Sequence, residues 1–200
     1  MPRQPWNRNI HYHGVVLDAI PAGCRRALDA GCGQGFLTRE LAPRCGEVVA
    51  IDADRDTLAL ARASADQAAR ITFVEGDVMT HPFVPGSFDF VAAVAMLHHV
   101  PLEPGLARFR DLLSPGGVLA IVGLHPLHTP LDYALAAVAI PSSLALRARH
   151  GWAAVGAPIK EPVETLREIH RACGVRLPGA VFRRHLLFRY SIVWRKPVRE

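Results

Sequence analysis

The chain alternates short apolar runs with longer segments in which apolar residues recur every three or four positions. A continuous apolar run of four to eight residues is typical of a buried strand, whereas the longer period is typical of a helix. Such alternation favours an α/β fold, in which helices cover both faces of a parallel sheet. The runs predict strands at 27–30, 47–51, 71–75, 88–94 and 117–123. The longer period predicts helices around 14–20 and at 35–42, 55–65 and 103–113.

The last third of the chain follows a different pattern. Residues 131–141 form an apolar run that ends at Pro141 and is too short for a membrane span, so we expect a helix that covers the sheet or lines a substrate pocket. Residues 161–172 predict another helix, with Gly174 as its left-handed cap. Residues 180–194 alternate in part between apolar and polar positions and predict two strands with a tight connection. Proline and glycine clusters predict turns at 82–86, 101–105 and 114–117.

Composition limits the class of protein. Two hundred residues that are 50% hydrophobic can bury one sizeable core, which predicts a single domain. The polar, proline-broken start of the chain does not resemble a secretion signal, so we expect a cytoplasmic protein. The four cysteines have no paired spacing and predict neither a disulfide framework nor a metal site.

Charge is distributed unevenly along the chain. Residues 1–124 carry 11 basic and 13 acidic groups, and residues 125–200 carry 12 and 5, so −2 and +7 add to the net charge of +5. A basic region attracts acidic partners through its long-range potential. Because the arginines are dispersed and no aromatic stacking platform is evident, a nucleic-acid partner is not favoured.

Three glycines follow the first predicted strand, at Gly31, Gly33 and Gly35. The dinucleotide-binding fingerprint has its third glycine one position later and places a pyrophosphate on a helix N-terminus. Asp29 precedes the first glycine by two residues and would repel a phosphate. The loop therefore favours a nucleotide ligand that carries a cation near Asp29.

The run Asp-Ala-Gly-Cys-Gly-Gln-Gly at 29–35 resembles the first motif of the class I S-adenosylmethionine-dependent methyltransferases. Further motifs match in order. Asp52 ends the second strand, 21 residues after Gly31, and Asp77 follows the third strand. Leu-His-His at 97–99 ends the fourth strand, and 112–122 resembles the family's turn and fifth strand. The resemblance implies a Rossmann-like, doubly wound sheet of seven strands in three layers, α/β/α, mostly parallel with an antiparallel C-terminal strand.

The resemblance also implies a site for S-adenosyl-L-methionine. Asp29 would place the cofactor's amino group, Asp52 would accept from both ribose hydroxyls, and Asp77 would either accept from the adenine or cap the turn that follows it. Neighbouring Asp54 and Asp56 are expected to cap a helix. The expected cofactor-binding residues are Tyr12, Asp29, Gly31, Cys32, Gly33, Gly35, Asp52, Ala53, Asp77, Val78 and Ala95.

Histidines are the candidates for proton chemistry because their unperturbed pKa near 6.5 suits a general base. His98 and His99 are the expected catalytic pair, with packing as the alternative, and His125 or His128 could bind the acceptor. No metal is expected. The domain would comprise an N-terminal cap over the cofactor (1–20), a cofactor-binding core (21–124), a substrate lid (125–158), and a C-terminal helix and strand pair (159–200).

The predicted function is methyl transfer to a small-molecule acceptor by in-line displacement. One alternative is a cofactor-binding scaffold or regulatory subunit without catalysis, and another is an NAD(P)-dependent oxidoreductase, which the early third glycine opposes. Methylation of DNA bases is opposed by Met-Leu-His-His at 96–99, where an Asn/Asp-Pro-Pro-Tyr/Phe segment would be needed. We expect no membrane partner, and the oligomeric state stays open.

Overall fold

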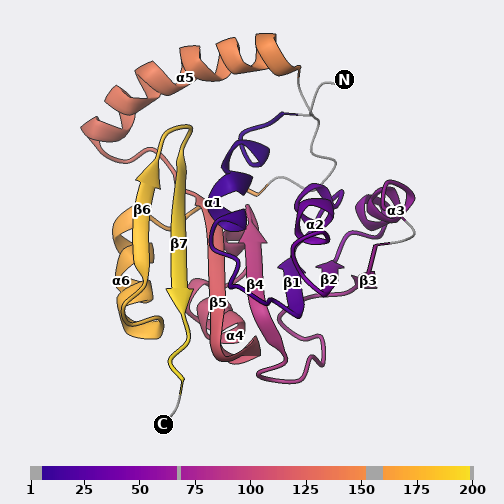
Figure 1. Ribbon diagram of the computed structural model, residues 1–200. Coiled ribbons are helices and arrows are strands. Elements are labelled where there is room, and N and C mark those ends of the chain that lie inside the picture. Colours follow the sequence, from indigo (N-terminus) through magenta and orange to yellow (C-terminus); the bar gives the residue numbers. More distant parts are fainter. Residues whose placement is uncertain (1–5, 67–68, 152–159, 199–200) are drawn as a thin grey trace.

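A computed structural model describes residues 6–66, 69–151 and 160–198 (Figure 1). Its centre is a seven-stranded sheet in the order β3-β2-β1-β4-β5-β7-β6. The first five strands pair in parallel, and β7 pairs antiparallel with both β5 and β6. This arrangement confirms the predicted sheet. The strands are β1 (Arg26–Ala30), β2 (Glu47–Asp52), β3 (Ile71–Glu75), β4 (Phe88–Val94), β5 (Leu113–Leu124), β6 (Val181–His185) and β7 (Arg189–Arg195).

Helices cover both faces of the sheet, because successive side chains of a strand point to opposite sides. Leu28 packs in one core cluster with residues of α4 and α6, whereas its neighbour Ala27 packs in another with residues of α1 and α2. The three layers are therefore α/β/α, as predicted. The helices are α1 (His13–Leu17), α2 (Phe36–Leu41), α3 (Arg55–Ala63), α4 (Leu102–Leu112), α5 (Pro130–His150) and α6 (Leu166–Arg176), with short 3-10 turns η1 (Ile10–Tyr12) and η2 (Leu97–His99).

Several boundaries differ from the sequence prediction. Helix α4 begins at Leu102, so the turn predicted at 101–105 is wrong. Helix α6 starts at Leu166 because Thr165 caps it, with Thr165 and Glu168 each accepting a hydrogen bond from the other's backbone N–H. Gly174 lies inside α6, so the prediction of a left-handed cap there is wrong. The predicted turn at 114–117 is the irregular first part of β5, where Gly116 has a φ of +77°.

Helix α5 also differs, because it continues through Pro141 and is 21 residues long. Its start is fixed by a capping box between Thr129 and Asp132, with Pro130 in the first turn, where its missing N–H costs nothing. By length and composition alone, Pro130–Arg149 is able to cross a membrane, a test that the core helix of a soluble protein also passes. The premise that this run is too short for a span is therefore wrong.

The carboxyl ends of the parallel strands meet at one edge of the sheet, which places the functional residues together. The order reverses between β1 and β4, since β1 lies between β4 on one side and β2 on the other. Open α/β sheets bind ligands at such a switch point. The division of the chain at residues 20, 124 and 158 stays a prediction, and residues 152–158 of the expected lid lie outside the described residues.

Candidate functional site

A cavity of about 380 Å³ opens at the carboxyl ends of β1, β2, β3 and β4. The N-terminal segment contributes Asn7, Asn9, Ile10 and His13 to its wall. Most of the sequence-predicted residues come together here. Those in the lining are Asp29, Gly31, Cys32, Gly33, Asp52, Ala53, Asp77, Val78, Ala95 and His99.

The glycine loop forms one wall and needs its glycines. Gly31, Gly33 and Gly35 have φ values of +71°, +52° and +70°, which side-chain-bearing residues rarely adopt. A Cβ on Gly31 would lie 2.5 Å from Cγ of Met96, across the cavity wall. The backbone N–H of Gly31 donates to the carbonyl of Ile51 at 2.9 Å, which ties the loop to β2. Gly35 lies outside the lining and forms the N-terminal cap position of α2.

Asp52 links the loop to the end of β2. Its Oδ2 accepts from the backbone N–H of Gly33 at 2.7 Å, and its Oδ1 accepts from that of Asp54 at 2.9 Å. A carboxylate oxygen can accept two hydrogen bonds, so each oxygen keeps acceptor capacity for a ligand hydroxyl. Asp54 accepts from the N–H of Thr57 and caps α3, as predicted.

Asp29 is the most buried acid of the cavity wall, with 2% of the residue exposed. The Oγ1 of Thr38 donates to its Oδ2 at 2.6 Å. Burial raises the pKa of Asp29 to about 6, because the charged form loses hydration that the hydrogen bonds from Thr38 only partly replace. A ligand cation beside Asp29 would stabilise the charged carboxylate, whereas a phosphate would destabilise it.

The third and fourth strands complete the cavity. Oδ1 of Asp77 accepts from the N–H of Met79 at 2.9 Å, so this residue caps its turn and also borders the cavity. The adenine contact stays a prediction. Val78 is buried beside it. Ala95 has a φ of +54°, a strained value for a residue with a side chain, and its N–H donates to the carbonyl of Val122.

The two catalytic candidates, His98 and His99, differ in their position relative to the cavity. His99 borders the cavity, and burial together with the charge of Lys160 lowers its pKa. His98 lies outside the lining, and burial and the nearby His99 and Arg189 lower its pKa to about 4. Both imidazoles are therefore neutral at pH 7. The buried Nδ1 of His98 has no hydrogen-bond partner within the described part of the chain.

Tyr12 does not reach the cavity. Its hydroxyl donates to the carbonyl of Leu186 at 2.7 Å, and its ring lies 4.9 Å from that of His185. The tip of the β6–β7 hairpin thus holds Tyr12 outside the cavity lining, which gives no support to the expectation of a tyrosine at the cofactor. The cavity is instead bordered by Asn9 and His13, on either side of Tyr12.

Arg189 anchors this N-terminal wall and was missed from the sequence. Its buried guanidinium donates to Oδ1 of Asn9 at 2.7 and 3.2 Å and to the carbonyl of Leu187 at 3.1 Å. A residue near the C-terminus thus holds a cavity residue 180 positions earlier. Spacing along the chain carries no signal for such a contact.

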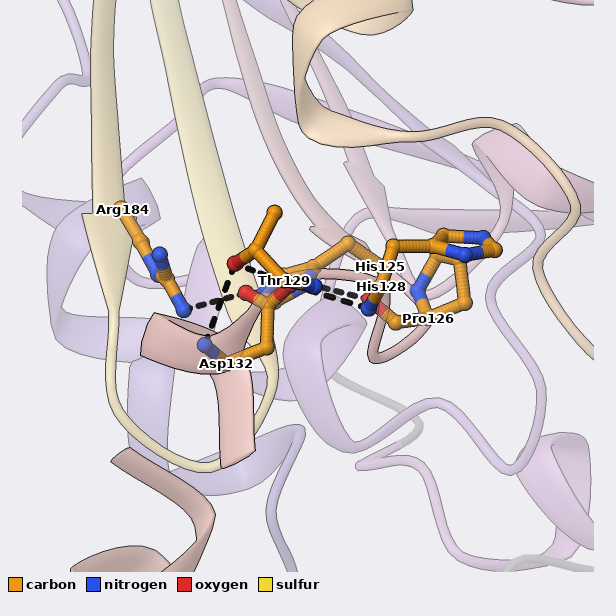
Figure 2. A network of polar contacts seen from close by, with 6 residues as sticks. All are labelled: His125, Pro126, His128, Thr129, Asp132 and Arg184. Atoms are coloured by element: carbon orange, nitrogen blue, oxygen red, sulfur yellow. Dashed lines mark hydrogen bonds and ion pairs between the residues drawn. The ribbon is translucent and has the colours of Figure 1, made fainter. Parts of the chain in front are cut away.

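The segment after β5 is built into the start of α5 and not into the cavity. The carboxylate of Asp132 accepts from the backbone N–H groups of His128 and Thr129 (Figure 2). Arg184 donates to the same carboxylate at 2.5 Å. Nδ1 of His125 lies 3.0 Å from the carbonyl of Pro126. None of these residues is in the lining of the cavity, and a contact of His125 or His128 with the acceptor stays a prediction.

Similarity to known proteins is consistent with this geometry. Residues 27–117 match the family model described as a methyltransferase domain. An uncharacterized methyltransferase of Mycobacterium tuberculosis is 37% identical over 199 residues, which cover 98% of this chain and 99% of the relative. The chain belongs to the class I S-adenosylmethionine-dependent methyltransferases.

Other relatives and structures of this family of methyltransferases match as well. Trans-aconitate 2-methyltransferase of Deinococcus radiodurans is 37% identical over 127 residues, 58% of this chain and 48% of the relative. A solved S-adenosylmethionine-dependent methyltransferase of Methanosarcina mazei has a TM-score of 0.63 at 19% identity, covering 98% of this chain and all of its own. Phosphoethanolamine N-methyltransferase 2 of Haemonchus contortus, solved with S-adenosyl-L-methionine, has a TM-score of 0.60 at 22% identity, covering 86% and 37%. These structures confirm the fold.

The cofactor of this methyltransferase is S-adenosylmethionine, and the cavity fits it. A buried carboxylate at Asp29 suits the ammonium of its methionine part, and the carboxylate of Asp52 suits a ribose diol. Gly31 lets the loop pack closely against Met96 in the cavity wall, where a Cβ would clash. In the described part of the chain, no group of three histidine, cysteine or acidic side chains is arranged to hold a metal ion.

Proposed function

We propose that this methyltransferase acts on a small-molecule acceptor, with the cavity at the carboxyl edge of the sheet as the cofactor site. The observation that carries the proposal is the convergence of Asp29, the glycine loop and Asp52 on one cavity. Relatives named for small acceptors support it, among them trans-aconitate 2-methyltransferase and the 2-phytyl-1,4-naphtoquinone methyltransferase of Thermosynechococcus vestitus.

The bound cofactor supplies a sulfonium methyl group, and the protein contributes by positioning. Holding two reactants in line lowers the barrier by roughly 7 to 11 kcal/mol in well-oriented systems. Asp29 and Asp52 fix the two ends of the ligand's polar part, and the backbone of Gly31 and Gly33 lets it approach closely. Asn9 and His13 border the cavity on the N-terminal side.

We propose His99, and not His98, as the group that accepts a proton from the acceptor. His99 borders the cavity, and its lowered pKa keeps the imidazole neutral and able to accept a proton at pH 7. Replacing His99 by Gln should lower kcat with little change in cofactor affinity, whereas His98→Gln should leave the pH profile of kcat unchanged.

The test of the function is turnover. The protein is incubated with S-adenosylmethionine and a panel of small oxygen, nitrogen and carbon acceptors, and release of S-adenosylhomocysteine is measured. Asp52→Ala serves as the matched control. Cofactor binding without turnover on a broad panel would favour the regulatory-subunit alternative.

A thermal-shift experiment separates the cofactor alternatives. A ligand at 100 times its Kd stabilises the native state by about 2.7 kcal/mol, so it raises the unfolding midpoint measurably. S-adenosylmethionine and S-adenosylhomocysteine should raise the midpoint, and NAD should not. A midpoint raised by NAD alone would contradict the proposal.

A further inference from the structure

Helix α5 has its polarity reversed with respect to an ordinary surface helix. Its inward stripe, Asp132, Ala136, Ala139 and Ser143, is buried and consists of small or polar residues. Its outward side carries the large apolar residues, each at least 50% exposed. These are Leu131, Tyr133, Val138, Ile140 and Leu144. A helix that faces water normally shows the opposite pattern, with its apolar stripe inward.

The outward side carries no charge over most of its length. From Pro130 to Ala145, all of which the structure describes, every exposed residue is apolar except Tyr133. The one acid in this span, Asp132, is buried and paired with Arg184. Ser142 is partly buried, and its hydroxyl is occupied by the carbonyl of Val138 at 2.8 Å. Contiguous exposed apolar surface of this kind marks an interaction site.

The inward stripe is fixed to the rest of the protein, so α5 cannot turn its apolar side inward without losing specific contacts. Nε of Arg8 donates to Oγ of Ser143 at 3.2 Å, and Arg184 pairs with Asp132 at the other end of the helix (Figure 2). Ala139 shares a core cluster with Leu187 at the hairpin tip. The apolar side is therefore presented outward by construction.

Charge at the end of α5 indicates what covers this side. Arg147 and Arg149 are exposed in the last turns, and residues 125–200 carry a charge of +7, from 12 basic and 5 acidic groups. Binding of a helix to a lipid surface becomes stronger with the apolar area that it buries there and with the attraction of its arginines to anionic lipids. If α5 paired antiparallel with α5 of a second copy, Arg147 and Arg149 would lie beside the first turn of the partner helix. The only acid of that turn, Asp132, is already buried and paired. If the two helices paired in parallel, the arginines of the two copies would repel each other.

We propose that α5 lies in the plane of an anionic membrane surface, with Leu131, Tyr133, Val138, Ile140 and Leu144 in the headgroup region and Arg147 and Arg149 on lipid phosphates. The contacts of Ser143 and Asp132 keep the helix attached, so it binds along the surface and does not span it. Figure 1 shows α5 beyond the carboxyl ends of β1 and β4, the edge where the cavity opens. Binding through α5 turns that edge of the sheet toward the membrane.

The test is flotation of the full chain with vesicles of phosphatidylcholine alone or with phosphatidylglycerol added. The wild type should bind the anionic vesicles about thirtyfold better, because two arginines near the surface each contribute about 1 kcal/mol and every ~1.4 kcal/mol is a factor of ten. High salt should remove most of that preference. Arg147→Ser with Arg149→Ser should abolish the preference and leave weak binding to neutral vesicles.

Val138→Glu with Leu144→Glu tests the apolar side, and Leu60→Glu on α3, also more than half exposed, is the matched control. The first variant should bind anionic vesicles at least about tenfold more weakly, since carboxylates are repelled by the surface and lose hydration there. The control should bind like the wild type. Unchanged circular dichroism and cofactor affinity would show that each variant is folded.

Three results would overturn the proposal. The wild type could stay in solution with both kinds of vesicle. The Leu60→Glu control could lose as much binding as the α5 variant, which would mean that net charge and not α5 decides the binding. Sedimentation could show a dimer that the α5 variant abolishes, which would assign the apolar side to a second copy of this chain.

Discussion

The protonation of Asp29 gives the sharpest quantitative prediction. Burial raises its pKa from 3.8 to about 6 in the protein without ligand, so the folded state holds a proton more tightly than the unfolded state does. For a group whose pKa is raised on folding, the stability contribution is fully present below about pH 4 and is lost as the pH rises through 6. A shift of about 2 units corresponds to about 3 kcal/mol of lost stability above pH 6.

The perturbation is Asp29→Asn, which removes the charge and keeps an oxygen that can accept from Thr38. Without ligand, the variant should be more stable than the wild type at pH 7 by up to about 3 kcal/mol, with the two converging near pH 4. Urea unfolding at several pH values measures this difference. Asp56→Asn, an exposed carboxylate of α3, is the control and should leave the pH dependence of the wild type unchanged.

Cofactor binding should depend on pH in the opposite direction to stability and become stronger as Asp29 ionises. If the ammonium of S-adenosylmethionine pairs with ionised Asp29, affinity should fall about tenfold from pH 7 to pH 5, since a pKa near 6 leaves about one tenth of the carboxyls ionised at pH 5. Asp29→Asn should bind weakly and without this pH dependence. Isothermal titration that finds a pH-independent wild-type affinity, or the same slope in the variant, would refute the reasoning.

Other predictions concern the walls of the cavity. Asp52→Ala should weaken cofactor binding strongly in calorimetry while circular dichroism stays unchanged; wild-type affinity would remove this residue from the site. Gly31→Ala should cost about 1 to 3 kcal/mol in urea unfolding because of its positive φ and the contact with Met96, whereas Gly14→Ala, with open space around it, should be neutral or stabilising. Deletion of residues 1–13 should impair cofactor retention, and unchanged affinity would discard the idea of an N-terminal cap.

Local sequence patterns were sufficient wherever a short segment carried its own physical reason. The strand predicted at 71–75 agrees with β3, and the one at 88–94 agrees with β4, because each is a short, mostly apolar segment bounded by turn residues. The start of α6 is also encoded locally, in the capping pair Thr165 and Glu168. The pattern of apolar residues predicts a start at residue 161, five residues before the observed start at Leu166. Helix α5 continues nine residues beyond Pro141, the residue that interrupts its apolar run.

The part of the site formed by the ends of the strands was predictable from the sequence. The part formed by the N-terminal segment was not. Asp29, Asp52 and Asp77 converge because parallel strands end at a common edge, and their spacing is set by one βα unit after another. Asn9 and His13 border the cavity because Arg189 and Leu186, near the other end of the chain, fix the N-terminal segment. The contacts that place Asn9 and His13 at the cavity and Tyr12 outside it join residues more than 170 positions apart.

The sequence by itself therefore determined the layered α/β architecture and the chemistry of the cofactor loop, since both depend on interactions within some twenty residues. Only the tertiary structure decided which N-terminal residues reach the cavity, which of His98 and His99 faces it, and that α5 presents its apolar side outward. The physical reason is the same in each case. The composition of a segment determines which apolar and polar side chains it carries. The contacts of the whole fold determine which of these side chains are buried and which are exposed.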